Sequence, residues 1–140
     1  MPIVTDTGFA ADDLNAHFAP SDALPANGPL VVDIAPDADL APVLDRLAEV
    51  VTIRVAFPSF ADGRGFTIAR QLRRAGFAGR LRAAGHVLAD QYAMARRAGF
   101  DEVEIDDALA ARQPEAQWLA RADWRAHDYQ ARLGRARDVA

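Results

Sequence analysis

The chain has 140 residues, no cysteine and a formal net charge of −4. This length suits one compact hydrophobic core, so we expect a single domain. Without cysteine, the chain can form no disulfide, thiolate zinc site or cysteine-held iron–sulfur cluster. No apolar run approaches the roughly 20 residues that span a bilayer, and the first residues lack a secretory pattern. We therefore expect a cytoplasmic protein that does not bind a membrane.

The charges are distributed unevenly along the chain. Residues 1–53 carry nine acidic side chains and one arginine, whereas residues 54–100 carry nine arginines and two aspartates, a balance of 9 − 2 = +7. All sixteen cationic residues are arginine, whose planar fork suits bidentate binding of carboxylates and oxyanions. Aromatic residues do not alternate with these arginines, which argues against nucleic acid. An acidic protein surface or a small anion fits better.

The N-terminal segment, residues 1–29, is rich in alanine, aspartate and proline. We expect it to be loosely structured, with at most one short helix near residues 9–18, and to carry little chemistry.

Residues 30–106 alternate between strand and helix patterns and form the expected core. Strands are predicted near residues 30–35, 51–57, 80–84 and 102–105, and helices near residues 39–49, 66–75 and 87–98. This βαβαβαβ order predicts an α/β fold with a small parallel sheet of about four strands and right-handed crossovers. Both an open sheet and a half-barrel-like arrangement fit the order.

The five-residue string Arg-Arg-Ala-Gly-Phe occurs twice, at residues 73–77 and 96–100. In both copies the glycine fits the left-handed position just after a helix, and the phenylalanine can pack back onto that helix. The arginines complement the negative end of the helix dipole. We interpret the repeat as shared capping chemistry rather than a shared function.

Residues 107–140 predict a C-terminal helical segment that Pro114 interrupts. Trp118, Ala122 and Tyr129 lie near one face of its second part. Such aromatic residues are more often core than interface, but a terminal helix with two tryptophans is also a candidate for docking.

The loop Asp62-Gly63-Arg64-Gly65 joins the second predicted strand to a helix. Its glycines can take positive φ and let the backbone approach a neighbour closely. The free N–H groups at the start of the helix could hold an anion. The loop matches neither the dinucleotide-binding pattern nor the P-loop, and no metal motif emerges, so no cofactor is evident and the cofactor stays unknown.

Ligands bind where loops leave the carboxyl ends of parallel strands, so polar residues at these ends are site candidates. The second strand delivers Asp62 and Arg64. The third delivers His86, with Asp90 and Gln91 at the start of the next helix. In the simpler alternative, the two aspartates stabilise helix N-termini and the histidine is a capping or solvent-facing residue.

Arg54 and Arg82 interrupt otherwise apolar strands. A parallel sheet covered on both faces should have continuous apolar strands, so at least one face of this sheet is expected to be polar. The two arginines either pair with carboxylates or, in a functional interpretation, Arg82 joins Arg64 in holding an anion.

Several short motifs within residues 51–105 together resemble one family. They are Phe57-Pro58 with Phe60, Asp62-Gly63-Arg64-Gly65, Leu81-Arg82-Ala83, Gly85, Asp90-Gln91 and Gly99-Phe100. On these residues the chain resembles an uncharacterised bacterial family catalogued as domain of unknown function nine hundred and thirty-four, typically encoded beside assimilatory sulfite reductase genes. The family often has aspartate where His86 stands, which weakens any role that depends on this histidine.

The resemblance implies an accessory protein for assimilatory sulfite reduction in cysteine biosynthesis, assisting sulfite reductase or electron delivery to it. The implied partner is sulfite reductase or an acidic ferredoxin- or flavodoxin-like electron donor, which the basic segment could steer into contact. No catalytic mechanism is implied, the catalytic residues are unknown, and homo-oligomer formation stays open. The candidate anion- or partner-binding residues are Asp62, Gly63, Arg64, Gly65, Arg82, His86, Asp90 and Gln91.

Two alternatives to the accessory role stay open. In one, the protein is a small enzyme or binding protein for an oxyanion or phosphate-bearing ligand, which Arg64 and Arg82 hold. In the other, it is a scaffold whose arginines form a solvated face.

Overall fold

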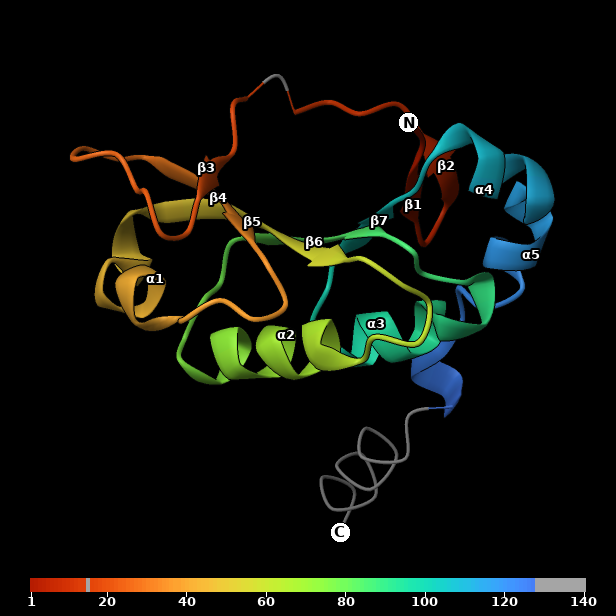
Figure 1. The fold of residues 1–140 in the computed structure, drawn as a ribbon. Helices are drawn as coiled ribbons and strands as arrows, with labels where there is room; N and C mark the ends of the chain where they lie inside the picture. The colour runs from red at the N-terminus through yellow and green to blue at the C-terminus, as the bar shows by residue number, and fades with distance from the viewer. Residues whose placement is uncertain (15, 128–140) are drawn as a thin grey trace, which may run out of the picture.

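The computed structural model describes residues 1–14 and 16–127 (Figure 1). It has an α/β fold built on a seven-stranded open sheet in the order β2-β1-β7-β6-β5-β4-β3. Strands β3 to β7 are parallel, whereas β1 is antiparallel to both β7 and β2. The strands are β1 Ile3–Thr5, β2 Gly8–Ala10, β3 Ala19–Pro20, β4 Leu30–Ile34, β5 Val50–Phe57, β6 Arg80–Gly85 and β7 Glu102–Glu104.

The sheet is larger than the predicted four strands because the N-terminal segment contributes to it. The four predicted strands correspond to β4, β5, β6 and β7, which are parallel neighbours. Within residues 1–29, Ile3–Thr5 and Gly8–Ala10 form β1 and β2 at one edge of the sheet, and Ala19–Pro20 forms β3 at the other. Within residues 9–14 and 16–18 the structure has no helix, contrary to the prediction.

The helices are α1 Ala41–Asp45, α2 Arg64–Arg74, α3 Tyr92–Ala98, α4 Asp107–Arg112 and α5 Glu115–Leu119. Short 3₁₀ helices occupy Leu47–Glu49, Ala89–Gln91 and Trp124–His127. Helices α2 and α3 cover one face of the sheet, and α4 and α5 lie beside β1 and β2 (Figure 1). Among the described residues, no helix is both long and apolar enough to cross a membrane.

The hydrophobic core lies between the sheet and helices α2 and α3. Alternate residues of the central strands, such as Ile53, Val55 and Leu81, are fully buried on this face. Phe57 packs edge-to-face on Phe66 and Phe100, with ring centroids 5.0 and 5.7 Å apart. Each such buried side chain stabilises the fold by about 1.5–3 kcal/mol. Ile68 and Leu72, four residues apart on α2, are both buried in this core.

Both copies of the Arg-Arg-Ala-Gly-Phe repeat end a helix in the same way. Gly76 and Gly99 have φ values of 103° and 120°. The N–H groups of Phe77 and Phe100 each donate to a carbonyl five residues back, at 3.0 Å, as in a Schellman motif. The structure therefore confirms that both copies of the repeat cap the end of a helix.

The Trp118 side chain of α5 belongs to the core. It is 1% exposed, packs edge-to-face on Tyr92 and donates from Nε1 to the Gln113 carbonyl at 2.9 Å. This tryptophan is therefore not available for docking. Tyr129, predicted to share its face, lies outside the described residues.

Candidate functional site

The face of the sheet opposite α2 and α3 is polar. A row of charged side chains crosses four parallel strands at one level, because Asp33, Arg54, Arg82 and Glu102 are direct neighbours in the register. Residues 11–14 and 16–18, which we call the crossing segment, pass over this polar face between β2 and β3 (Figure 1). The expectation of one polar sheet face is therefore met.

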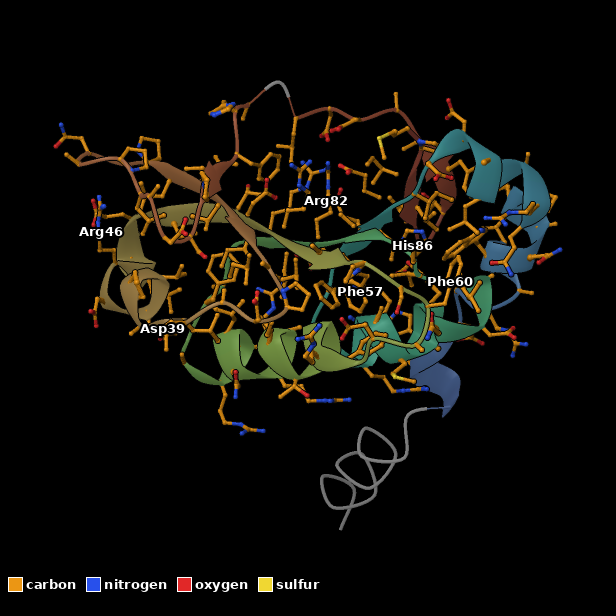
Figure 2. All side chains as sticks on the ribbon, viewed as in Figure 1. Asp39, Arg46, Phe57, Phe60, Arg82 and His86 are labelled. Carbon is orange, nitrogen blue, oxygen red and sulfur yellow. The ribbon has the colours of Figure 1, made fainter. Side chains whose placement is uncertain are left out.

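Arg82 lies at the centre of the polar face and is fully buried. It points toward the crossing segment (Figure 2), where both Oδ atoms of Asp12 accept hydrogen bonds at 3.2 Å. It also donates to Glu102 and Glu104, each at 2.9 Å. Burial opposes its charge, but hydrogen bonds and charge from Asp12 and Glu102 outweigh this, so the pKa of Arg82 is raised.

Arg54 is held just beside this cluster. Its guanidinium donates to Asp33 at 2.6 and 2.8 Å and to Glu104 at 3.3 Å. The ring of Phe18, from the crossing segment, stacks 3.9 Å from the guanidinium carbon. Because Arg54 and Arg82 are opposite each other on β5 and β6, Glu104 separates two like charges that would otherwise repel.

The loop Asp62-Gly63-Arg64-Gly65 is at the carboxyl end of β5. Asp62 accepts hydrogen bonds from the backbone N–H of Arg64 at 3.1 Å and from its guanidinium at 3.0 and 2.7 Å. The hydrogen bond from the Arg64 side chain is the main cause that lowers the pKa of Asp62. The Arg64 side chain stays 59% exposed. Arg64 is therefore accessible, but it is already paired.

The two glycines of this loop do not take positive φ, so that expectation is wrong. Gly63 has φ −90°, and neither it nor Gly65 is among the positive-φ residues. The expectation of close approach holds for Gly65, where an added Cβ would lie 2.7 and 2.9 Å from ring atoms of Phe57. The second glycine is thus needed for helix packing against the strand.

His86 follows β6 at the same edge of the sheet. Its backbone N–H donates to the Phe57 carbonyl at 2.9 Å, and Nδ1 lies 3.2 Å from the same oxygen. The imidazole is exposed and packs edge-to-face on Phe60 (Figure 2), with ring centroids 4.9 Å apart. The structure thus brings the loops of Asp62 and His86 to one edge, with His86 facing an aromatic ring.

Asp90 and Gln91 have different environments in the 3₁₀ helix Ala89–Gln91. Gln91 accepts from the Leu88 N–H at 2.9 Å and donates to the Phe60 carbonyl at 3.2 Å. It therefore ties the loop after β5 to the loop after β6. Asp90 is exposed and pairs with Arg121 at 3.0 Å.

The predicted site residues do not converge on one point. Arg82 is buried on the polar face, whereas Arg64 begins α2, which covers the opposite face. The two arginines therefore cannot bind the same anion in this structure. Of the predicted set, the residues brought together at the carboxyl edge are Asp62, Arg64, His86 and Gln91.

A cavity of about 890 Å³ opens at this same edge, on the polar face. Its floor consists of Ala56, Ala84 and Gly85 at the ends of β5 and β6. Ala56 and Ala84 follow Arg54 and Arg82 of the charged row by two residues on the same strands. Arg54 lines it, together with five carboxylates: Asp22, Asp33, Asp37, Asp39 and Glu104. Among the described residues, no group of three or more histidine, aspartate or glutamate side chains is placed to hold a metal ion.

Comparison with protein families gave one match. The model of the family described as "Bacterial protein of unknown function (DUF934)" matches residues 31–139. The chain belongs to this family. No significant match was found among curated proteins or among solved structures.

The DUF934 match begins inside β4, so it includes β5, β6 and β7 and most of the cavity. Strands β1, β2 and β3 and the crossing segment precede it. These N-terminal residues are the ones whose roles sequence reasoning missed. The acidic character of residues 1–53, beside a basic centre, was the available signal: Asp6, Asp12, Asp13 and Asp33 all pair with arginines between residues 54 and 96.

Proposed function

We propose that the protein is an accessory component of assimilatory sulfite reduction that binds an acidic electron-donor protein through the outer surface of α2 and α3. The sulfite-reduction role comes from the family resemblance. The docking role is supported by one structural observation: three exposed arginines that have no ion pair within the described part of the chain lie on these two helices.

Most of the basic central segment is neutralised inside the molecule. Six of its nine arginines pair with carboxylates, and these are Arg54, Arg64, Arg73, Arg80, Arg82 and Arg96. The remaining three, Arg70, Arg74 and Arg97, are exposed and have no ion pair within the described part of the chain. We call these three the helix arginines.

The helix arginines share one side of the molecule. Arg70 and Arg74 are one turn apart on α2, on the surface opposite the buried Ile68 and Leu72. Arg97 is exposed on α3, which packs beside α2. Nitrogen-tipped side chains project from the outer side of these helices (Figure 2). An acidic donor would meet a cationic surface here, which raises the association rate and makes it sensitive to salt.

A binding measurement with purified proteins tests the proposal. We expect an acidic ferredoxin or flavodoxin from the same host to bind the full chain at low salt. The affinity should fall as the salt concentration rises. Arg74→Glu should slow association severalfold. Arg112→Glu is the matched control, because Arg112 is also exposed and also ends its helix, α4. Equal effects of the two substitutions, or binding that is insensitive to salt, would contradict docking on α2 and α3.

A genetic test addresses the pathway separately. Deleting the gene should create a requirement for cysteine or sulfide that sulfite does not relieve. Complementation with the Arg74→Glu variant should be poorer than with Arg112→Glu. Normal growth of the deletion strain on sulfate, with no paralogue present, would overturn the sulfite-reduction role even if a donor protein binds.

A further inference from the structure

The cavity at the carboxyl edge of the sheet is distinct from the helix arginines, because it lies on the polar face rather than under α2 and α3. We propose that this cavity binds a small organic cation, with an amine or guanidinium head and an apolar body. The inference does not depend on the role in sulfite reduction.

The cavity has the position and size of a small-molecule site. Its volume of about 890 Å³ lies within the usual range for such sites. It opens at the carboxyl ends of the central parallel strands, where ligands bind in open α/β sheets. Small side chains create the hollow: Ala56 and Ala84 face each other across β5 and β6, and Gly85 extends the floor. Larger residues at these positions would fill the space.

Part of the cavity lining is apolar. Besides the two alanines of the floor, the lining includes the apolar residues Ile34, Ala38, Pro20 and Pro42. Apolar surface of this kind favours a ligand with a hydrocarbon or aromatic body, because water is released when the two surfaces meet.

Apart from the Ser21 hydroxyl and the N-terminal ammonium of Met1, which lies 3.8 Å from Asp107 outside the lining, the side-chain groups that remain free in the cavity are acceptors. Arg54 is the one cationic side chain in the lining, and Asp33 and Glu104 already bind it. Asp22 and Asp37 are exposed and accept no hydrogen bond within the described part of the chain, and Asp39 uses one oxygen for the Ala41 N–H. A ligand that donates hydrogen bonds and carries positive charge is the complement of these groups.

The spacing of the carboxylates favours an organic cation over a metal ion. The described residues contain no cluster that could coordinate a metal, and the five carboxylates come from four places: the loop after β3, β4, the loop after β4, and β7. A spread negative rim attracts an extended cation and repels sulfite, sulfate or a phosphate ester. The cavity therefore does not support the alternative in which the protein binds an oxyanion or a phosphate-bearing ligand.

Binding of three matched probes tests the ligand class. The probes are 2-phenylethylamine, the neutral 2-phenylethanol and the anionic 3-phenylpropionate, which share an aromatic body and differ in charge. With the full ¹⁵N-labelled chain at pH 7, we expect the amine to give saturable amide shifts at Ala56, Ala84 and Gly85, with a Kd of about 1 mM. The alcohol should bind at least severalfold more weakly, and the anion should not bind.

Variants then locate the site. Ala56→Leu should abolish binding, and because Ala56 is exposed on the sheet surface the variant should still fold. Asp37→Asn should weaken binding of the amine about two- to fivefold and leave binding of the alcohol unchanged. Asp45 is an exposed carboxylate on α1 outside the cavity, so Asp45→Asn should not change binding of either probe.

Three outcomes would overturn the proposal. The first is the absence of saturable shifts for all three probes. The second is equal binding of the alcohol or preferred binding of the anion, which would reject the cationic ligand class. The third is amine binding that Ala56→Leu leaves intact, which would place it elsewhere on the protein.

Discussion

Arg82 and Glu104 form an ion pair with both side chains buried: Nη1 of Arg82 lies 2.9 Å from Oε1 of Glu104, and the two side chains are 0% and 8% exposed. The same oxygen lies 3.3 Å from Arg54, so one carboxylate serves two arginines on neighbouring strands. The polar face therefore depends on Glu104 for its charge balance.

Glu104→Ala should destabilise the protein by about 3 kcal/mol or more, because it leaves a buried guanidinium with fewer partners and two arginines side by side. Urea unfolding followed by circular dichroism measures the loss. Glu49→Ala is the control, since its pair with Arg46 is at the surface, and it should have little effect. A similar small effect for Glu104→Ala would contradict the importance of the buried pair.

Gly65→Ala and Gly63→Ala should differ clearly in their effect on the stability of the protein. An added methyl group at residue 65 meets the Phe57 ring, and the overpacking should cost about 1–3 kcal/mol. At residue 63 nothing lies within 4 Å of an added Cβ and φ is −90°, so alanine is accommodated. Thermal melts of the two variants test this. Equal melting temperatures would show that the close packing of α2 on β5 is not required.

Asp6 joins the turn between β1 and β2 to the C-terminal half of the chain. It accepts hydrogen bonds from the Tyr92 hydroxyl, from Arg96 at 3.1 Å and from Trp124 Nε1 at 3.4 Å. Partial burial raises the pKa of Asp6, but these hydrogen bonds and the Arg96 charge outweigh it, so the pKa is lowered.

A lowered folded-state pKa makes the contribution of Asp6 fully present above its unfolded pKa of about 3.9, and the contribution is lost as the pH falls through the folded value. Asp6→Asn should therefore lower the Tm most at pH 7, and the difference from wild type should shrink below about pH 4. Differential scanning calorimetry across this range checks it. A Tm difference that is constant with pH would show that the charge of Asp6 is not involved.

Gln91→Glu tests the link between the loops after β5 and β6. Glutamate keeps the acceptor for the Leu88 N–H but loses the donor to the Phe60 carbonyl, so about 1–3 kcal/mol of stability should be lost. Hydrogen exchange should speed up in the loop that contains Phe60. If the variant is as stable as wild type with unchanged exchange, Gln91 does not tie the two loops together.

The central part of the fold is predictable because its signals are local. Strands β4, β5 and β6 alternate apolar residues with residues of the polar face, and the glycine-ended helices α2 and α3 carry their own capping chemistry. The three N-terminal strands are not predictable in this way, because they have two or three residues each and no helix separates them, so they lack the strand–helix alternation that marks β7. Their pairing depends on partners far along the chain, such as Val4 beside Val103.

The candidate site was only partly predictable for a related reason. Chain order places Asp62 and His86 at the ends of neighbouring parallel strands, so their shared edge follows from the alternation alone. The environment of Arg82 does not, because Asp12 lies seventy residues away and reaches the arginine through the crossing segment. The cavity was equally hidden, since its floor depends on the absence of side-chain volume at Ala56 and Ala84.

The N-terminal strands also have a consequence for aggregation. One stretch of chain supplies the outermost strands at both edges of the sheet, β2 and β3, and these are only three and two residues long. Short outer strands offer few free backbone groups to another molecule. A protein that starts near residue 30 would keep the four central strands, but it would expose β4 and β7 as unprotected edges. We expect such a truncated form to self-associate through these edges.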